Sequence, residues 1–309
     1  MLDKIARLRE NVASVYLGET AVIDRIICCL LARGHVLIED VPGVGKTVLA
    51  SAIAKSIRGT FSRVQLTPDL LPADIIGVTI FSKDGNAFEF RRGPIFANIV
   101  LADEINRTTP RTQTALLEAM SDGSISIDGT THTLEPPFIV LATQNPYEFE
   151  GTYLLPENQL DRFLMRISLG YPSAEAEHRL LEVRPSQTVL ETLAPVLDAS
   201  DFVEMQGEVD RVMLSEPIRD FLIRFAHATR AHDSIEIGLS PRGTLALAHA
   251  SRATAAMAGR DHVIPEDVLG NVTPVCAHRV FLRGDSGFSN WNAAAAVLDE
   301  ILRTVGSPI

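Results

Sequence analysis

Short apolar runs alternate with segments of helical periodicity throughout the first 170 residues of the chain. Each apolar run has the length and the residue types of a strand, and the segments between them repeat apolar residues at helical spacing. The predicted strands are residues 35–38, 61–66, 99–104, 138–142 and 164–169. This alternation predicts a mostly parallel sheet covered by helices on both faces, which is an α/β fold.

The pattern changes after about residue 171. Strand-like runs nearly vanish, and serine or proline residues that favour helix N-termini precede apolar segments of helical spacing. The predicted helices begin at Ser173, Ser200, Ser215, Ser240 and Pro265. We therefore expect two domains, an α/β domain over residues 1–170 and a smaller all-helical domain over residues 171–309.

Two hairpins are predicted inside the α/β domain. Their turns are the Asp-Gly pairs at 84–85 and 128–129, each between two short strand-like runs. An unusually apolar loop at 68–77 precedes the first hairpin, and together they are more than a simple connection requires. We expect this loop and hairpin either to pack in the interior or to form a surface that contacts a partner or a bound chain.

The composition is that of a globular chain with a sizeable core. Of 309 residues, 46% are hydrophobic and 22% are charged, which excludes a disordered chain. No apolar run approaches the length that crosses a bilayer, so no membrane segment is expected, and residues 1–10 are charged and helix-periodic, unlike a signal peptide. The net charge of −11 argues against nucleic acid as the main ligand, because gripping phosphates requires a basic face.

The three cysteines and eight histidines show neither a disulfide framework nor metal-ligand spacing. Cys28 and Cys29 are adjacent in an apolar helical segment. We therefore expect core residues in a reducing compartment, and hence a cytoplasmic protein. Cys276 and His278 lack a second pair of ligands and are interpreted as structural.

Residues 35–47 combine a strand, a glycine-containing loop and a helix start in the order that binds the phosphates of a nucleotide. A helix N-terminus attracts anions because its amide groups are unpaired and carry a partial positive charge. Glycines let successive amides point inward, Lys46 adds a positive charge, and the Thr47 hydroxyl is a ligand for Mg²⁺. The predicted nucleotide-binding residues of this segment are Val41, Pro42, Gly43, Val44, Gly45, Lys46, Thr47 and Val48.

The strict phosphate-loop pattern has glycine at the position of Asp40 in this chain. We expect the loop to tolerate this change, because aspartate adopts a left-handed backbone more readily than most residues. The alternative interpretation is an ordinary strand-to-helix turn. Gly45, Lys46 and Thr47 at a helix start after an apolar strand favour phosphate binding.

Polar side chains end two later strands. Asp103 and Glu104 follow the apolar run 99–102, and Asn145 follows the strand 138–142. In a parallel sheet, these strand ends lie at the edge that carries the phosphate loop. We predict that Asp103 binds Mg²⁺, that Glu104 positions and polarises the attacking water, and that Asn145 hydrogen-bonds this water or the γ-phosphate. The alternatives are a solvated strand end for the two acids and a turn residue for Asn145.

Two further segments are candidates for nucleotide contact. Tyr16, Leu17 and Gly18 end a helical segment upstream of the phosphate loop and either lie against an adenine ring or simply pack at the helix end. Arg242 lies in the first turn of a predicted helix, where the helix dipole disfavours a cation. It is therefore either placed for an anion or is a solvated arginine.

Together these motifs resemble the MoxR group of AAA+ ATPases over essentially the whole chain, most specifically in residues 39–47, 102–107, 142–146, 160–163 and 239–242. The resemblance implies a RecA-like P-loop αβα sandwich, that is, an AAA+ core with a five-stranded sheet, and a helical lid with nucleotide between them. Aspartate at position 40 is common in this group. The implied roles are Walker A for Lys46 and Thr47, Walker B for Asp103 and Glu104, sensor 1 for Asn145 and sensor 2 for Arg242, the last acting in cis or in trans.

The resemblance also implies Mg²⁺-dependent hydrolysis of ATP to ADP at the subunit interfaces of a ring, usually a homo-hexamer. Arg162 resembles the arginine finger that reaches the γ-phosphate of a neighbouring subunit, and Arg166 and Arg107 are less favoured candidates. The two hairpins resemble the helix-2 and pre-sensor-1 inserts of this clade. Such proteins are thought to act as chaperones that mature or assemble client proteins, often with von Willebrand factor A-domain partners.

Two related motors share much of this pattern, a metal-chelatase motor subunit and a nucleic-acid-remodelling motor. The acidic net charge disfavours the second of them. A GTPase and a transporter ATPase are disfavoured because the sequence has neither the Asn-Lys-x-Asp guanine motif nor the Ser-Gly-Gly signature.

Overall fold

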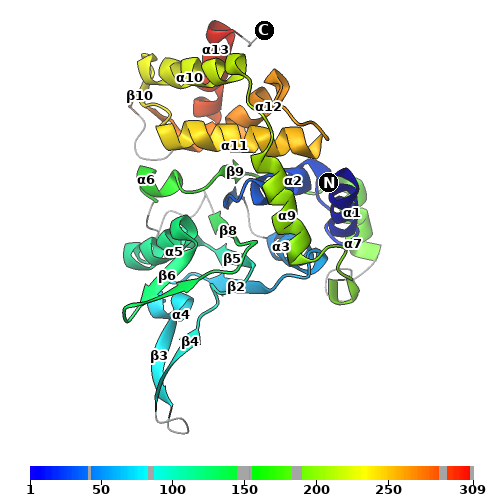
Figure 1. Cartoon of the computed structure of the whole chain (residues 1–309), viewed down its shortest axis with the longest axis vertical. Coiled ribbons are helices and arrows are strands. Elements are labelled where there is room, and N and C mark those ends of the chain that lie inside the picture. Colours follow the sequence, from blue (N-terminus) through cyan, green and yellow to red (C-terminus); the bar gives the residue numbers. More distant parts are fainter. Residues whose placement is uncertain are drawn as a thin grey trace.

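The computed structural model describes residues 1–40, 43–82, 87–144, 153, 155–182, 190–284 and 291–306. Figure 1 shows three parts along the long axis of the molecule: a group of helices at one end, a central sheet with its flanking helices, and a hairpin that projects from the other end. The first two parts correspond to the helical lid and the α/β core that the sequence predicts.

All five predicted strands form one parallel sheet. Its strand order is β2–β5–β8–β1–β9, and each neighbouring pair is parallel. The strand that leads into the phosphate loop, β1, therefore lies inside the sheet, beside β8. The strands are β1 (Val36–Glu39), β2 (Phe61–Gln65), β5 (Ile99–Asp103), β8 (Ile139–Gln144) and β9 (Met165–Ile167).

Alternate residues of the strands enter two separate hydrophobic cores. Val36 and Ile38 belong to the core that includes residues of α1, α2 and α3, whereas Leu37 belongs to the core that includes residues of α5. Because successive side chains of a strand point to opposite faces, the sheet is covered on both sides, as predicted. Figure 1 shows these helices on either side of the strands. The helices are α1 (Leu2–Ala13), α2 (Thr20–Leu31), α3 (Lys46–Ser56), α4 (Pro72–Ile76), η1 (Ile105–Arg107), α5 (Pro110–Asp122) and α6 (Glu157–Leu160).

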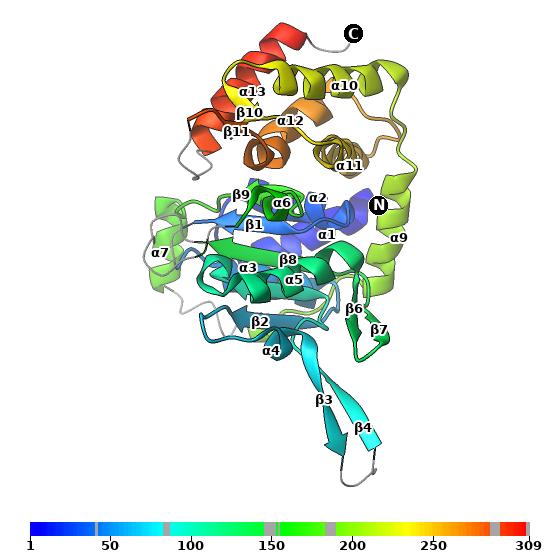
Figure 2. The same ribbon diagram turned by 90° about the vertical axis from the view of Figure 1, so that its left-hand side faces the viewer.

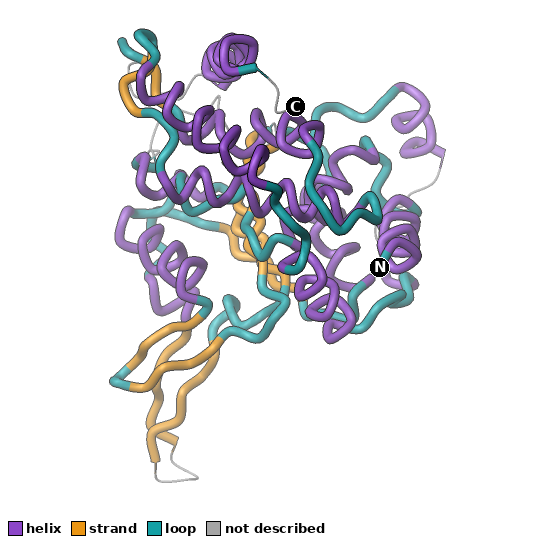
Figure 3. Tube along the Cα trace, turned by 45° about the horizontal axis from the view of Figure 1, so that its top comes forward, coloured by secondary structure: helices purple, strands orange, loops and turns teal. Residues whose placement is uncertain are grey.

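The two predicted hairpins lie beside one another, where Phe90 stacks on His132 with 4.3 Å between ring centroids. Figures 2 and 3 show the longer hairpin extending away from the sheet. At its base, Ile75 of α4 is buried, whereas Phe81 and Phe88 farther out are 51% and 75% exposed. The base therefore packs in the interior, as one expectation had it, while the outer part is exposed; its contact with a partner or a bound chain stays a prediction. The strands are β3 (Gly77–Ser82), β4 (Ala87–Arg92), β6 (Ser124–Ile127) and β7 (Thr130–Thr133).

The C-terminal part is built mainly from helices, and the five predicted helix starts are correct to within a residue. Ser240 caps α11 by accepting a hydrogen bond from the Gly243 amide over 3.0 Å. Helix α13 and the short β10–β11 ladder were not predicted. The elements are α7 (Ala174–Glu182), α9 (Ala199–Asp210), α10 (Glu216–Ala231), β10 (Ile235–Ile237), α11 (Pro241–Met257), α12 (Pro265–Cys276), η2 (Ala277–Arg279), β11 (Phe281–Leu282) and α13 (Trp291–Val305).

The segment that leads into the lid packs on the α/β core. The Val196 and Leu197 amides donate to the Ser56 carbonyl at 2.9 and 3.0 Å, and Gln206 of α9 donates to the Leu30 carbonyl at 2.7 Å. Part of the chain beyond residue 170 thus contacts the first predicted domain, and the proposed division at that residue stays a prediction. Within the described ranges, no helix is both long and apolar enough to cross a bilayer.

The three cysteines are buried, as expected of core residues. Burial raises the pKa of Cys28 to about 11 and that of Cys276 to about 12, so both thiols stay protonated. His278 is also buried and its Nε2 lies 3.0 Å from the Phe163 carbonyl. These residues join the lid to the core, in agreement with their structural interpretation.

Candidate nucleotide-binding site

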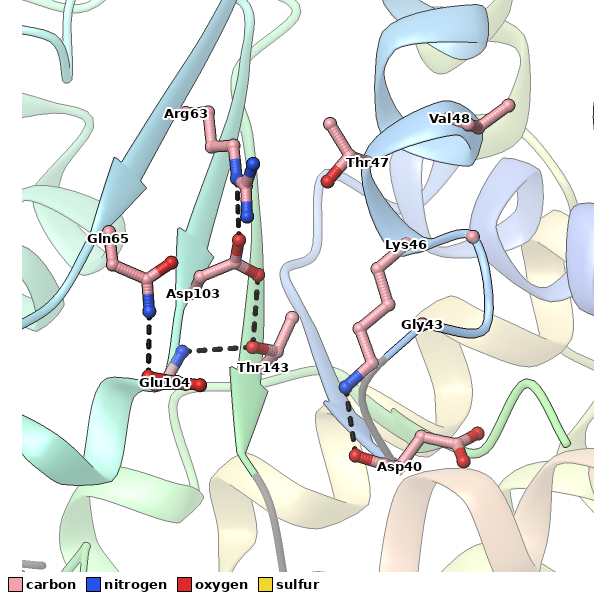
Figure 4. A pocket seen from close by; sticks show the side chains of 11 residues that line it. Asp40, Gly43, Lys46, Thr47, Val48, Arg63, Gln65, Asp103, Glu104 and Thr143 are labelled. Atoms are coloured by element: carbon pink, nitrogen blue, oxygen red, sulfur yellow. Dashed lines mark hydrogen bonds and ion pairs between the residues drawn. The ribbon is translucent and has the colours of Figure 1, made fainter. Parts of the chain in front are cut away.

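A cavity of about 340 Å³ lies where the carboxyl ends of β1, β5 and β8 meet the start of α3. Its volume falls within the range of ~300–1,000 Å³ that is typical of ligand pockets. Figure 4 shows that side chains from the sheet and from α3 face one another across it. The residues that line it are Asp40, Gly43, Gly45, Lys46, Thr47, Val48, Arg63, Gln65, Asp103, Glu104 and Thr143.

The loop before α3 has the backbone that a phosphate cradle requires. Gly43 and Gly45 have φ angles of 89° and 90°, a region that side chains other than glycine rarely adopt. Gly45 is the N-cap of α3, so the unpaired amides at the start of this helix face the cavity that Lys46 and Thr47 line. An anion in this cavity would meet both the amides and the positive end of the helix dipole.

Lys46 supplies a positive charge beside the phosphate loop. Its Nζ donates a hydrogen bond to the backbone carbonyl of Asp40 over 2.9 Å, as Figure 4 shows. Burial lowers the pKa of Lys46, and the negative charges of Asp40, Asp103 and Glu104 only partly oppose this effect. A phosphate would compensate the half-buried ammonium more fully than a neutral carbonyl does.

Thr47 and Asp103 are the candidate metal ligands. Figure 4 shows the Thr47 hydroxyl facing the Asp103 carboxylate across the cavity. Oxygen ligands suit Mg²⁺, and a carboxylate that accepts two hydrogen bonds keeps further lone pairs for a metal or its waters. The residues present therefore fit a magnesium ion held between the phosphates and β5.

The Asp103 carboxylate is fixed by two neighbours that the sequence did not identify. Arg63 of β2 donates from Nε to Oδ2 over 2.7 Å, and Thr143 of β8 donates from its hydroxyl to Oδ1 over 3.2 Å. The Thr143 hydroxyl also accepts a hydrogen bond from the Glu104 amide at 2.9 Å. Thr143 thus joins the ends of β5 and β8 at the site.

Glu104 is held in an unusual backbone conformation. Its φ of 59° and ψ of 53° are left-handed, which is uncommon outside glycine and often found at functional sites. Gln65 of β2 donates from Nε2 to Glu104 Oε2 over 2.7 Å, and Arg107 Nε lies 3.2 Å from the same oxygen. The carboxylate is therefore oriented at the cavity wall by two side chains.

Besides Thr143, sequence reasoning missed Arg63 and Gln65 as residues of the candidate site. The alternation along residues 61–65 does place both on one face of β2. Their position beside the acids, however, depends on the pairing of β2 with β5, in which Gln65 lies opposite Asp103. No local pattern gives this register.

Asp40 has a different role from the one expected. Its backbone is not left-handed, because the described non-glycine residues with positive φ are Arg33, Arg58, Glu104 and Asp128. Instead its Oδ2 accepts hydrogen bonds from the Leu169 amide at 2.7 Å, the Gly170 amide at 2.8 Å and the Ser168 hydroxyl at 3.0 Å. Asp40 thus ties the phosphate loop to the segment after β9, and our reason for its tolerance was wrong.

Several predicted residues do not line the cavity. Tyr16 is buried, and its ring comes within 3.4 Å of a Cβ built on Gly45, so the segment 16–18 packs behind the phosphate loop. Burial is the main cause that raises the pKa of Tyr16 to about 12. This contact supports packing and leaves adenine binding by Tyr16, Leu17 and Gly18 a prediction. Three further predicted residues, Val41, Pro42 and Asn145, lie outside the described residues.

The four arginines of interest lie in different surroundings. Arg162 donates from Nη1 to the Leu117 carbonyl at 2.6 Å and to the Ser121 hydroxyl at 3.0 Å, and Arg242 is exposed in the first turn of α11. Neither is among the described residues that line the cavity of their own chain. Arg107 pairs with Glu104, and Arg166 is buried in an ion pair with Glu39. Arg107, Arg162 and Arg166 are thus all engaged inside their own chain.

Comparisons with known proteins agree with this geometry. The family described as "ATPase family associated with various cellular activities (AAA)" matches residues 35–165, and the "AAA lid domain" matches residues 227–301. A solved structure from Cytophaga hutchinsonii, described as that of a candidate ATPase, superposes with a TM-score of 0.89 at 35% identity and covers 99% of this chain and 95% of its own. The fold and site thus define an AAA+ ATPase with a RecA-like core and a helical lid.

Two curated relatives narrow the assignment. The chain is 46% identical to YeaC of Bacillus subtilis over 97% of this chain and 93% of that protein. It is 38% identical to "Chaperone MoxR1" of Mycobacterium tuberculosis over 96% of this chain and 81% of that protein. The chain therefore belongs to the MoxR family of AAA+ ATPases, as its motifs indicated.

Proposed function

We propose that the chain hydrolyses ATP in a Mg²⁺-dependent reaction at this cavity and uses the reaction to remodel protein clients. The observation that carries the proposal is the meeting of Lys46, Thr47, Asp103 and Glu104 around one cavity. These residues come from two segments that are 56 positions apart in the chain, and a role in packing alone would not require them to face a common space.

The chain's own groups have distinct tasks in this mechanism. The amides of the loop and the Lys46 ammonium hold the phosphates, while Thr47 and Asp103 would hold Mg²⁺, which would supply positive charge to offset that of the phosphates. Glu104 orients a water for in-line attack on the γ-phosphate and accepts its proton. Gln65 and Arg107 set the direction of the Glu104 carboxylate. Asn145 is proposed to hydrogen-bond the same water or the γ-phosphate.

Arg162 is proposed to complete the site of a neighbouring subunit in a ring, most simply a hexamer. Its side chain contacts α5 rather than the cavity of its own chain, so a contact with a γ-phosphate would have to be made in trans. Arg242 is proposed to contact the phosphates, in cis or in trans, from the first turn of α11. A positive charge placed on the transition state in trans is worth ~10³–10⁵ in rate.

Client remodelling is proposed from the family. A relative named as a chaperone, MoxR1, supports association with protein clients. We further propose a partner with a von Willebrand factor A domain, as the resemblance of the motifs implies. The exposed outer part of the β3–β4 hairpin offers apolar surface for such contacts.

A phosphate-release assay with matched variants tests the proposed reaction. We expect Mg²⁺-dependent release by the parent chain and its loss in Lys46→Ala and Glu104→Gln. The matched control is Lys55→Ala, which removes a lysine from the same helix whose Nζ donates to the Leu190 carbonyl, away from the cavity. Equal release by the parent and Lys46→Ala would contradict the proposal.

A further inference from the structure

A buried arginine connects the end of β1 to the lid. Arg166 of β9 has a side chain that is only 6% exposed and pairs through Nη2 with Oε2 of Glu39. The other oxygen of Glu39 accepts a hydrogen bond from Gln144 Nε2 at 2.9 Å. Glu39 therefore joins the carboxyl end of β8 to the middle of β9 at the position where the phosphate loop begins.

The guanidinium group of Arg166 also contacts the lid. Its Cζ lies 4.7 Å from the centroid of the Trp291 ring, at the first residue of α13. Burial lowers the pKa of Arg166 to about 10, so the group keeps its charge at neutral pH. A charge over the face of an indole is attracted by the ring, so this contact holds the start of α13 against β9.

The nucleotide site adjoins this linkage through one peptide unit. Glu39 precedes Asp40, whose carbonyl accepts a hydrogen bond from Lys46 Nζ. A phosphate competes with that carbonyl for the ammonium. Ligand binding therefore changes the hydrogen bonding at the end of β1, directly beside the residue that holds Arg166.

A purely structural explanation accounts poorly for these residue types. Replacing a buried ion pair by apolar residues of similar volume is often neutral or stabilising, because both charges must be removed from water. Such a pair at the junction of the phosphate loop and the lid is better explained by a need to fix the position of the lid relative to the phosphate loop.

We propose that Arg166 is a positioning residue that couples the phosphate loop, through Glu39, to lid helix α13, through Trp291. This inference rests on the proposed function, since it assumes that nucleotide binds at Lys46. The coupling would set the position of the lid for hydrolysis without contributing to the grip on the phosphates.

The chain carries its own reporter for this coupling, because Trp291 is its sole tryptophan. Titrating the full-length chain with Mg·ATP while recording tryptophan emission should give a saturable change. In Arg166→Lys, which keeps a charge and loses the planar contact, that change should disappear. We expect kcat to fall about tenfold and KM to stay within about threefold, the pattern of a lost interaction made only in the transition state.

Two other variants test whether misfolding, rather than the lost contact, causes the effects of Arg166→Lys. Glu39→Gln keeps the side-chain shape and the tryptophan but removes the ion pair, so it should reproduce the loss of the emission change. Trp291→Phe keeps an aromatic face and should retain kcat within about threefold. The matched control is Arg260→Lys in a lid-only pair with Asp267, joined by bonds of 2.6 Å, which should leave both readouts at parent values.

The outcomes separate this inference from the proposed function. A parent chain that shows no ATP binding by calorimetry overturns both. ATP binding and hydrolysis with an emission change that persists in Arg166→Lys and Glu39→Gln overturn the coupling alone. Loss of the emission change in both variants, with ATP affinity retained and the Arg260→Lys control unaffected, supports it.

Discussion

Asp40 provides the most quantitative test of how the phosphate loop is held. Its Oδ2 accepts three hydrogen bonds from the segment after β9, and of the three donors the Leu169 amide is the most deeply buried. In Asp40→Ala that amide loses its acceptor, and an unsatisfied buried donor costs about 1–3 kcal/mol. The Gly170 amide and the Ser168 hydroxyl belong to exposed residues and can be hydrated in the variant. Each therefore contributes less to the loss of unfolding free energy than the Leu169 amide does. We expect a loss of about 3 kcal/mol in unfolding free energy.

Urea unfolding followed by circular dichroism measures this loss, and melting should occur roughly 5 °C lower. Asp40→Asn retains an oxygen acceptor without the charge and should lose about half as much. The matched control is Asp210→Ala, which removes an aspartate from the exposed pair with Arg33, where both side chains are nearly half exposed. Exposed pairs contribute only about 0–1 kcal/mol. If Asp40→Ala proves no less stable than Asp210→Ala, the anchoring role of Asp40 is refuted.

Three further predictions follow from the site and the core. Arg162→Ala should bind ATP like the parent and lose most turnover, by ~10³-fold or more, and parent-like turnover would show that Arg162 is not the finger. Gln65→Leu removes a 2.7 Å bond to Glu104 and should lower kcat about 10- to 100-fold with ATP affinity retained; unchanged kcat would mean that this bond does not orient the base. Burial lowers the pKa of His35 from 6.5 to about 4. The pKa of His35 is lower in the folded chain than in the unfolded chain. The contribution of neutral His35 to the unfolding free energy is therefore complete above pH 6.5, and roughly 3 kcal/mol of it is lost as the pH falls toward 4. Urea unfolding at about pH 7.5 and about pH 5 should show a smaller loss for His35→Gln, and an equal loss would assign the effect to other groups.

The sequence predicted the edge of the sheet that carries the cavity, because local patterns were sufficient there. An apolar run that ends in Asp103 and Glu104 indicates a strand with polar residues at its carboxyl end. The apolar run 35–38, followed by the glycine loop and Lys46, indicates a second strand of this kind. Parallel strands bring such ends to the same edge whatever their order. The five-stranded parallel sheet was confirmed for the same reason.

Features that depend on contacts between distant segments were not predictable in this way. The anchoring of Asp40 requires the segment after β9, more than a hundred positions later, to return to the phosphate loop. The β10–β11 ladder pairs strands of only three and two residues, which are too short to leave a periodic signal. Helix α13 did carry a signal, because its buried residues Ala294, Leu298 and Ile301 recur at helical spacing, but its alanine-rich start concealed it.

The hairpins illustrate a different limit. The Asp-Gly pair at 128–129 correctly placed the turn of the second hairpin, whereas the pair at 84–85 lies outside the described residues. The loop before the first hairpin was recognised as unusually apolar. Which of these apolar residues would be exposed depended on how far the hairpin extends from the sheet. Phe88 is largely exposed while Ile75 is buried, although both are large apolar residues in neighbouring elements.

The central claim is that one cavity, built from the phosphate loop and the end of β5, binds the nucleotide. Calorimetric titration of Mg·ATP into the Glu104→Gln chain tests it most directly, because this variant should bind ATP without consuming it. We predict one saturable binding event per chain, which disappears when Lys46→Ala is added. An absence of binding heat, or equal binding with and without Lys46, would contradict the account.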